Sequence, residues 1–342
     1  MTVRRLVSLL VAALVVLALA APAGAVERPP GPSGPLSFPR DHQPHFGYGV
    51  EWWYTTGIVE AEDGTRYGVL WVLFGATGGA VAVSQVVDLD RDRIVHHSEQ
   101  ISFGGLPPGP LDERSDDHYV TFTDTGRYGR WRVRMDGDES GLDLTLVPTK
   151  PYVRHGKGGI VQQADGGPSA YYSSTRMRAR GTLTVDGKVK QVRGGAFWLD
   201  RQWGNYDVDP DALRWDWFSC RFANGTELML YQFVEPDGRT PSRYRAGTFV
   251  ERDGRVRRLG AFTATQLGPS ITPPGASASY GYRWRLRVPS LDLRVTLTPL
   301  ARNQYVDNRI VASFWEGAAR ATGTSAGKCF VELSREARAT AG

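Results

Sequence analysis

The sequence predicts an all-β protein made of two tandem antiparallel β-barrels. From Trp52 onward, short segments rich in Val, Leu and aromatic residues alternate with Gly, Pro, Asp and Asn, which is typical of strands separated by turns. No amphipathic pattern in this region extends beyond two helical turns. Asp-Gly and Asn-Gly pairs, which favour tight hairpin turns, recur at Asp63-Gly64, Asp186-Gly187, Asn224-Gly225, Asp237-Gly238 and Asp253-Gly254.

Five motifs occur twice in the same order, which indicates two copies of one strand meander. The separation between the copies shrinks along the chain, from 161 residues between Gly64 and Gly225 to 133 residues between Phe197 and Phe330. A unit of about 130–160 residues suits one barrel of about eight short strands. The paired motifs are WWYTTG and WDWFSC, RWRVR and RWRLR, LDLTL and LDLRV, YYSSTRMRARGT and FWEGAARATGT, and AFWLD and CFVEL.

The N-terminus sets the first expected domain boundaries. Arg4 and Arg5, the apolar run Leu6–Ala20 and the small residues Ala23–Ala25 have the pattern of a secretory signal peptide. We therefore expect residues 1–25 to be cleaved and the protein to be exported. The remaining expected segments are an exposed Pro- and Gly-rich linker over 26–39, an N-terminal barrel over 40–205 and a C-terminal barrel over 206–342.

The charge distribution gives no sign of a nucleic-acid or membrane partner. The formal net charge of +5 falls to +3 without Arg4 and Arg5, and the remaining basic residues are scattered singly. We expect neither nucleic-acid binding nor stable membrane insertion. Oligomeric state cannot be read from the sequence. Cys220 and Cys329 could form a disulfide in an exported protein or remain as two buried thiols.

Motifs for several common chemistries are absent. The sequence has no G-x-S-x-G nucleophile elbow, no phosphate-binding loop, no C-x-x-C pair and no H-E-x-x-H motif. Asp41, His42 and His45 could begin a metal site, but an isolated His-x-x-His in an irregular segment is more typical of a plain loop. We therefore expect no metal and no cofactor.

Aromatic and carboxylate residues gather in a few segments, and these form the candidate site. As catalytic groups we expect Asp200, Gln202, Tyr54 and Glu51, which could protonate, polarise or orient a substrate. Asp216 and Glu316 are further carboxylates in these segments. The alternative is structural, since aromatic rings close barrel ends and acids pair with Arg. The aromatic residues expected to bind an apolar substrate are Trp52, Trp53, Tyr172, Trp198, Trp203, Trp215, Trp217 and Trp315.

The stretch GVEWWYTTG shows how such a site could be placed. Successive side chains of a strand point to opposite faces, so the adjacent aromatic residues from Trp52 to Tyr54 cannot all enter one core. We expect one face to close the first barrel and the other to meet the segment FWLDRQWG between the barrels. Glu51 is expected at this junction, within about 12 Å of Asp200, close enough for a water-bridged network.

The motifs resemble the AttH and carotenoid 1,2-hydratase (CrtC) group of lipocalin-like proteins. The resemblance extends from Phe38 to Leu333 and implies two lipocalin-like barrels that hold a hydrophobic small molecule. This family includes hydratases of carotenoid precursors and relatives that cyclise linear polyenes by an intramolecular [4+2] reaction. The segments that carry the resemblance are FPRDHQPH, VEWWYTTG, YYSSTRMRARGTL, GGAFWLDRQWGNY, RWDWFSCRFANGTELMLYQF and FWEGAARATGT.

One departure from the family pattern bears on the reaction. The family usually has W-x-D-x-E-W, whereas this chain has Gln202 at the position of the second acid. Because hydration needs a proton donor and a base while cyclisation needs neither, we expect a cofactor-independent [4+2] cyclase in natural-product biosynthesis. The alternatives are a hydratase that acts on an isoprenoid double bond and a non-catalytic carrier of an exported hydrophobic metabolite.

Overall fold

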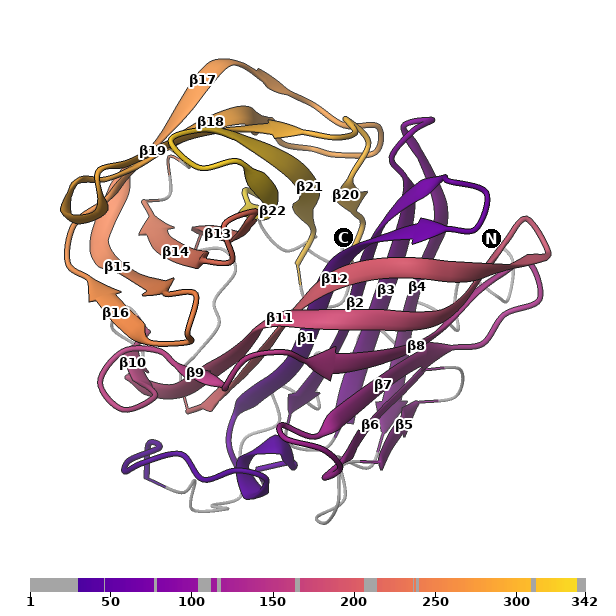
Figure 1. Ribbon diagram of the computed structural model, residues 1–342, viewed down its shortest axis with the longest axis horizontal. Coiled ribbons are helices and arrows are strands. Elements are labelled where there is room, and N and C mark those ends of the chain that lie inside the picture. The colour runs from indigo at the N-terminus through magenta and orange to yellow at the C-terminus, as the bar shows by residue number, and fades with distance from the viewer. Residues whose placement is uncertain are drawn as a thin grey trace, which may run out of the picture.

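The protein consists of two curled antiparallel sheets that lie side by side (Figure 1). The fold is described from a computed structural model. The two sheets confirm the predicted all-β class with tandem lipocalin-like halves. Among the described residues, no ladder joins the first and last strands of either sheet. The structure describes residues 30–45, 47–76, 79–103, 112–115, 118–163, 167–205, 214–235, 237, 240–308 and 312–336. The expected signal peptide lies outside these ranges.

The first sheet has the strand order β4-β3-β2-β1-β12-β11-β8-β7-β6-β5, with β9 and β10 paired to β11. Its long central strands β11 and β12 extend beyond the rest of the sheet (Figure 1). Its strands are β1 (Val50–Ala61), β2 (Arg66–Ala76), β3 (Gly79–Asp88), β4 (Arg93–Phe103), β5 (Asp112–Ser115), β6 (His118–Thr123), β7 (Arg130–Met135), β8 (Ser140–Pro148), β9 (Val153–Arg154), β10 (Ile160–Gln162), β11 (Pro168–Val185) and β12 (Lys188–Gly204).

The second sheet has the order β16-β15-β14-β13-β22-β21-β19-β18-β17, with β20 paired to β21. Two short 3₁₀ helices, η1 (Arg40–His42) and η3 (Pro289–Leu291), complete the described elements. The strands of this sheet are β13 (Arg214–Phe222), β14 (Glu227–Val234), β15 (Pro241–Val250), β16 (Val256–Leu259), β17 (Thr263–Ile271), β18 (Tyr280–Val288), β19 (Leu293–Pro299), β20 (Tyr305–Val306), β21 (Phe314–Gly323) and β22 (Gly327–Ser334).

The two strand orders match, so the repeat seen in the sequence is a repeat of structure. The order β3-β2-β1-β12-β11-β8-β7 corresponds to β15-β14-β13-β22-β21-β19-β18. The duplicated motifs map to corresponding strands: for example, RWRVR lies in β7 and RWRLR in β18, while AFWLD lies in β12 and CFVEL in β22.

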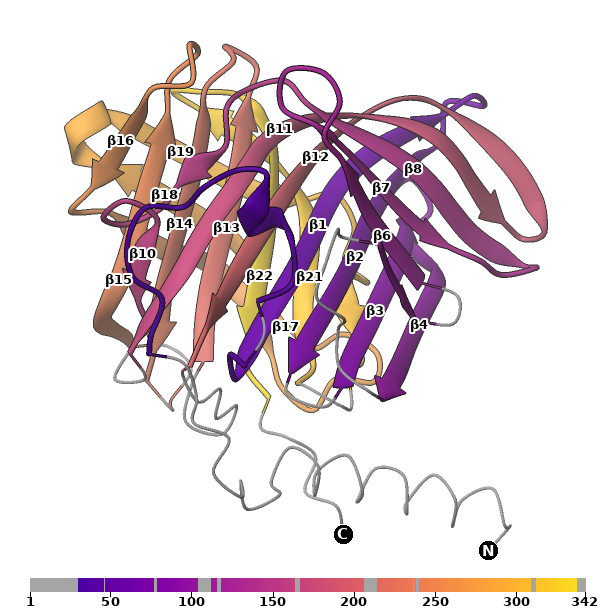
Figure 2. The same cartoon turned by 90° about the horizontal axis from the view of Figure 1, so that it is seen from below.

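Alternate faces of the central strands build three apolar clusters. Trp53, Val59 and other inward residues form the core of the first half, and Phe218 and Trp284 belong to the core of the second half. A third cluster combines outward residues of both sheets, including Tyr54. The halves are thus joined by a continuous buried contact, along which their strands lie side by side (Figure 2).

The segment before β1 packs on the first half instead of forming an exposed linker throughout. Leu36 is buried in the first core and Phe38 packs against it. The ring of Phe38 stacks on His42, which is buried and shares a hydrogen bond of 2.6 Å with the hydroxyl of Tyr172. Residues 26–39 were expected to form an exposed linker. The described part of this segment differs because Leu36 and Phe38 pack against aromatic residues of the first half.

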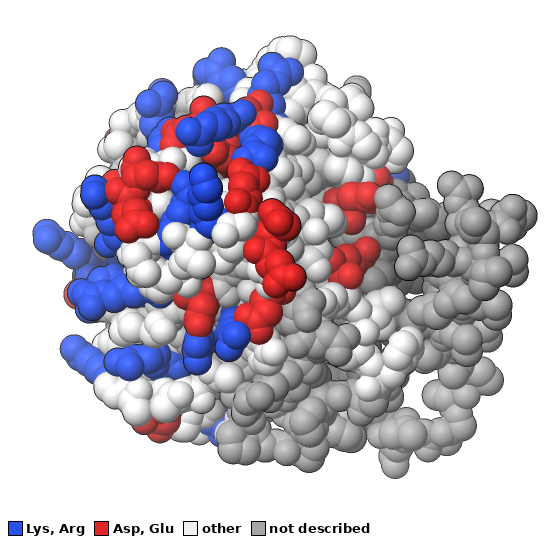
Figure 3. Space-filling model, turned by 90° about the vertical axis from the view of Figure 1, so that its right-hand side faces the viewer, with Lys and Arg blue, Asp and Glu red and all other residues white. Residues whose placement is uncertain are grey.

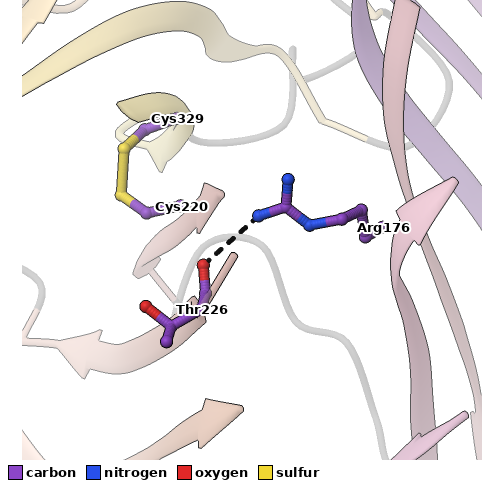
Figure 4. The surroundings of a disulfide bond; sticks show 4 residues. All are labelled: Arg176, Cys220, Thr226 and Cys329. Carbon is purple, nitrogen blue, oxygen red and sulfur yellow. Dashed lines mark hydrogen bonds between the residues drawn. A yellow bond between two sulfur atoms is a disulfide. The ribbon is translucent and has the colours of Figure 1, made fainter. Parts of the chain in front are cut away.

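The two cysteines, whose state the sequence left open, form a disulfide between neighbouring strands of the second sheet (Figure 4). Cys220 in β13 lies opposite Cys329 in β22, and the bond joins positions separated by 109 residues. Figure 4 also shows Arg176 of the first sheet, which donates a hydrogen bond of 3.4 Å to the carbonyl of Thr226. The disulfide therefore lies close to a polar link between the halves.

That polar link is centred on a buried carboxylate. Glu227 of β14 is fully buried and accepts hydrogen bonds from Lys150 at 2.8 Å and Arg176 at 2.5 Å. Both cations belong to the first half of the chain, so one acid of the second half satisfies two charges of the first. On the surface, acids and bases are interspersed on the face that Figure 3 shows.

Candidate active site

Asp200 is the centre of a buried hydrogen-bond network between the sheets. It lies on the outward face of β12 opposite Tyr54 of β1, and its side chain is only slightly exposed. The hydroxyl of Tyr171 donates to it at 2.7 Å and the indole of Trp198 at 2.6 Å, and the hydroxyl of Ser173 donates a third bond. Strand alternation places all these groups on one face of the sheet.

The environment of Asp200 shifts its titration toward neutral pH. Burial raises the pKa of Asp200 to about 6, although its three hydrogen-bond donors favour the charged form and oppose this rise. A carboxyl group with such a pKa exchanges protons readily near neutral pH. Asp200 therefore has the properties of a general acid or base.

Two carboxyl groups of the second sheet lie near Tyr54. Glu316 of β21 and Glu332 of β22 are opposite each other in the ladder, so their side chains share a face. Burial, reinforced by the charge of Glu332, raises the pKa of Glu316 well above its usual value. Burial also raises the pKa of Glu332 to about 7, although the indole of Trp215 donates a hydrogen bond to it.

Two buried polar groups of this cluster, the hydroxyl of Tyr54 and the carboxyl of Glu316, make no hydrogen bond of ordinary geometry to the described residues. They interact instead with each other and with the carboxyl of Glu332. Burial, and then the charges of Glu316 and Glu332, raise the pKa of the Tyr54 hydroxyl well above its usual value. Because buried polar groups are normally well hydrogen-bonded, this poorly satisfied cluster of Tyr54, Glu316 and Glu332 is a candidate place for a polar group of a ligand to bind.

Aromatic rings surround these polar groups. The ring of Trp217 lies edge-on to Tyr54 at 5.6 Å and to Trp198 at 6.1 Å, and its indole donates to Tyr171 at 3.1 Å. Trp52, Phe74 and Trp215 pack against the same cluster while remaining partly exposed, and Glu332 is also partly exposed. The acid network therefore extends from the buried contact to an edge that solvent reaches.

The structure brings together only part of the residues predicted from the sequence. Asp200, Tyr54, Trp198, Trp217, Trp52 and Trp215 lie at the contact between the sheets. Gln202 shares the face of Asp200, but its amide donates to Ser169 at 2.6 Å. Four other predicted residues, Trp53, Tyr172, Trp203 and Trp315, instead lie in the cores of the two halves.

The expectation that Glu51 lies at the junction was wrong. Glu51 is opposite Trp203 in the ladder, three positions from Tyr54, so it faces the interior of the first half. Its carboxylate accepts a hydrogen bond of 2.7 Å from Arg201, whose guanidinium is 3.7 Å from the ring centroid of Trp53. Burial opposes the charge of Glu51, but Arg201 and His45 outweigh it and hold the pKa of Glu51 below its usual value.

Sequence reasoning missed Glu332 and gave Glu316 no role of its own. Glu332 lies in CFVEL, the motif that echoes AFWLD beside Asp200. The echo was a signal that the second copy places an acid near the same contact. Asp216, also considered from the sequence, instead pairs with Arg335 and accepts a hydrogen bond of 2.9 Å from Gln232.

No group of three His, Cys, Asp or Glu side chains in the described ranges is arranged to hold a metal ion. Asp41 instead accepts hydrogen bonds from Arg40 at 2.8 Å and from the backbone of Ser37 at 2.5 Å. In the part of the chain that the structure describes, no helix has the length and apolar character needed to cross a membrane.

A family model described as AttH-like matches residues 29–335. The chain belongs to the AttH-like family. A solved structure of a putative AttH from Nitrosomonas europaea is 26% identical with a TM-score of 0.79, over 89% of this chain and 98% of that one. None of the curated proteins compared with this AttH-like chain matches it in sequence.

Two more distant structures share the AttH-like fold. Kievitone hydratase from Nectria haematococca is 18% identical, with a TM-score of 0.72, over 90% of this chain and 94% of that one. CghA is 14% identical, with a TM-score of 0.56, over 92% of this chain and 97% of that one. CghA has also been solved with Sch210972, and that structure has a TM-score of 0.54 to this chain.

Proposed function

We propose that the protein is a cofactor-independent enzyme that acts on an unsaturated, largely apolar small molecule at the contact between its sheets. The observation that carries this proposal is the buried carboxyl of Glu316, which lies beside the carboxyl of Glu332, makes no hydrogen bond of ordinary geometry and has a strongly raised pKa. A buried carboxyl with a raised pKa keeps its proton to higher pH than an exposed one, and it can therefore act as a proton donor. The aromatic surroundings of Trp198 and Trp217 suit an apolar substrate.

The arrangement of three acids favours the addition of water to a carbon–carbon double bond. Protonated Glu316 gives its proton to one alkene carbon, the π electrons form the new C–H bond, and the other carbon becomes a cation. A water molecule forms the C–O bond, and its released proton passes to the carboxylate of Asp200 or Glu332 and then returns to Glu316. The faces of the nearby Trp rings would stabilise the cation.

Intramolecular [4+2] cyclisation of a linear polyene is the second candidate. The observation that favours it is the buried hydroxyl of Tyr54, which makes no hydrogen bond of ordinary geometry to the described residues and could donate to a dienophile carbonyl. The aromatic surroundings would hold the folded chain. Hydration ranks first because it requires proton transfer, for which carboxyl groups with raised pKa values such as Glu316 and Glu332 are suited. Cyclisation requires no proton transfer.

We also infer that the protein works outside the cytoplasm. The sequence pattern of residues 1–25 and the disulfide between Cys220 and Cys329 support this, since disulfides persist in oxidising compartments. The corresponding non-catalytic reading is a carrier of an exported hydrophobic metabolite.

Purified protein incubated with a panel of linear polyenes and isoprenoids separates these readings by mass spectrometry. Hydration adds the mass of one water, cyclisation gives an isomer with a new retention time, and a carrier quenches Trp fluorescence without any product. We expect hydration, and Glu316→Gln should lower its rate by at least about 100-fold, the usual size of general-acid catalysis.

The matched control is Glu139→Gln, which replaces an exposed acid of the first half and should leave the rate unchanged. The Glu316→Gln and Glu139→Gln variants should bind substrate as tightly as the wild-type protein does, as measured by Trp fluorescence. If Glu316→Gln retained full hydration activity while folded, the assignment of Glu316 as proton donor would be wrong.

A further inference from the structure

A pocket lies where the two sheets meet, away from the acid network. It has a volume of about 340 Å³, within the range of pockets that hold small organic ligands. Residues of β1, β2 and β12, all in the first sheet, form most of its wall. Lys328 of β22 is the lining residue from the second sheet. Ile58 and Lys328, which line it, are each four positions along their strands from Tyr54 and Glu332, or roughly 13 Å at the rise of a strand.

A β-bulge turns Arg193 into this pocket. Glu60 pairs with Gly194 and Ala61 pairs with Val192, so Arg193 is the extra residue of β12. Val192 belongs to the core of the first half, and a side chain at Gly195 would meet the core residues Val59 and Ala179. The two positions between them, Arg193 and Gly194, therefore both face outward, where strict alternation would have turned one of them inward.

The positive charge around the pocket is not balanced. Arg193, Arg66 and Lys328 line it against one acid, Glu60, and Arg66 is already paired with Asp90. Neither Arg193 nor Lys328 forms an ion pair within the described residues. An anion would therefore find two available cations at the pocket wall.

A buried guanidinium lies beside Lys328 on the neighbouring strand. Arg221 of β13 is opposite Lys328 in the ladder, is 4% exposed, and none of its three guanidinium nitrogens has a hydrogen-bond partner. Its charge acts on the neighbour, since burial and then the charge of Arg221 lower the pKa of Lys328. A buried charge without a hydrogen-bond partner is costly, and an anion bound at the adjacent Lys328 would offset part of that cost through its charge.

We propose that this pocket binds a small organic anion, whose charged group contacts Lys328 and Arg193 and whose apolar body lies against Ile58 and Ala196. The site is separate from the acid network and does not depend on the proposed reaction. Gly194 supports an open space here, because a methyl group added to it would meet no atom within 4 Å.

Calorimetric titration of the full chain tests the proposal with three probes: hexanoate, the neutral analogue hexan-1-ol and inorganic phosphate. We expect hexanoate to bind with a dissociation constant of about 1 mM or tighter, a common strength for a small ligand with one ion-pair contact. Hexan-1-ol and phosphate should bind at least about tenfold more weakly. Higher ionic strength should weaken the binding of hexanoate, because exposed charges are screened.

Variants separate the pocket from general surface charge. Lys328→Gln and Arg193→Gln should each weaken hexanoate binding by about tenfold, and Gly194→Met should fill the pocket and abolish binding while the protein stays folded. Lys188→Gln, an exposed cation of the same strand, should change nothing. Equal binding of hexanoate and hexan-1-ol, equal binding of phosphate, or unchanged binding by all three pocket variants would each overturn the proposal.

Discussion

Carboxyl groups at the contact between the sheets have pKa values that differ from those in water. Glu332 shows this most clearly, because burial raises its pKa to about 7. A raised pKa means that the folded protein binds a proton more tightly than the unfolded chain does. The contribution of Glu332 to stability is therefore complete below its unfolded pKa and is lost as pH rises through about 7.

Replacing Glu332 by Gln should make this pH dependence measurable. Above pH 7 the charged carboxylate costs the wild-type protein up to about 3 kcal/mol, and the neutral amide of the variant avoids that cost. Glu332→Gln should thus be more stable than wild type at pH 8, with the difference vanishing near pH 4. Urea unfolding at both values checks this, and Glu139→Gln is the exposed control. A pH-independent difference would show that packing, not titration, causes the change.

At the scale of elements, the two faces of β1 and β12 serve different purposes. The outward face presents Tyr54 and Asp200 to the second sheet, whereas the inward face holds the ion pair of Glu51 and Arg201. Arg201 also donates at 2.8 Å to the carbonyl of Gln43, so it anchors the segment before β1. The inward pair is therefore a structural feature of the first half.

Breaking that pair should cost stability without touching the acid network. Glu51→Gln leaves the buried Arg201 without its carboxylate, which we expect to lower the free energy of unfolding by about 3–5 kcal/mol. The double variant Glu51→Met with Arg201→Met should lose less than this, because no charge is left unpaired. Chemical unfolding of both proteins provides the comparison, and a larger loss in the double variant would contradict the argument.

Sequence reasoning reached the class, the repeat and half of the site for identifiable reasons. Turn pairs such as Asn224-Gly225 and the ordered motifs are local signals, and they predict strands without any knowledge of pairing. The face of a residue follows from alternation, but which face meets the second sheet depends on register. The sequence therefore put Glu51 on the wrong face: its neighbour Trp52 packs at the contact between the sheets, whereas Glu51 itself points into the first half. The pairing of Glu316 with Glu332 and the bulge at Arg193 are register effects that a single sequence does not reveal.

At the scale of the whole molecule, the halves are fastened by polar as well as apolar contacts. Glu227 accepts bonds from Lys150 and Arg176, and both cations come from the other half. The contact also includes the apolar side chains that surround Met229. The relative position of the halves is therefore fixed by a buried charge cluster whose parts are far apart in sequence.

Removal of the central acid tests this fastening. Glu227→Gln should lower the free energy of unfolding by about 3–5 kcal/mol, because it leaves the buried Lys150 and the half-buried Arg176 without their counter-charge. Asp253→Asn removes the exposed pair of Asp253 with Arg255 at 3.9 Å, while the amide oxygen can still accept the hydrogen bond of 3.0 Å from the backbone of Arg255, and stability should change by less than about 0.5 kcal/mol. Thermal and urea unfolding give both values, and equal effects of the two substitutions would refute the role of Glu227.

The matching strand orders have one more consequence. Because each half contributes corresponding central strands to the contact, two related surfaces meet within one chain. Two identical copies that met through such a contact would have to carry the same groups on both sides of it. Within one chain that requirement does not apply, and the contact between the sheets is asymmetric. The first half contributes Asp200 and Tyr54, and the second half contributes Glu316 and Glu332. Proton donor and proton acceptor can thus change independently in each copy.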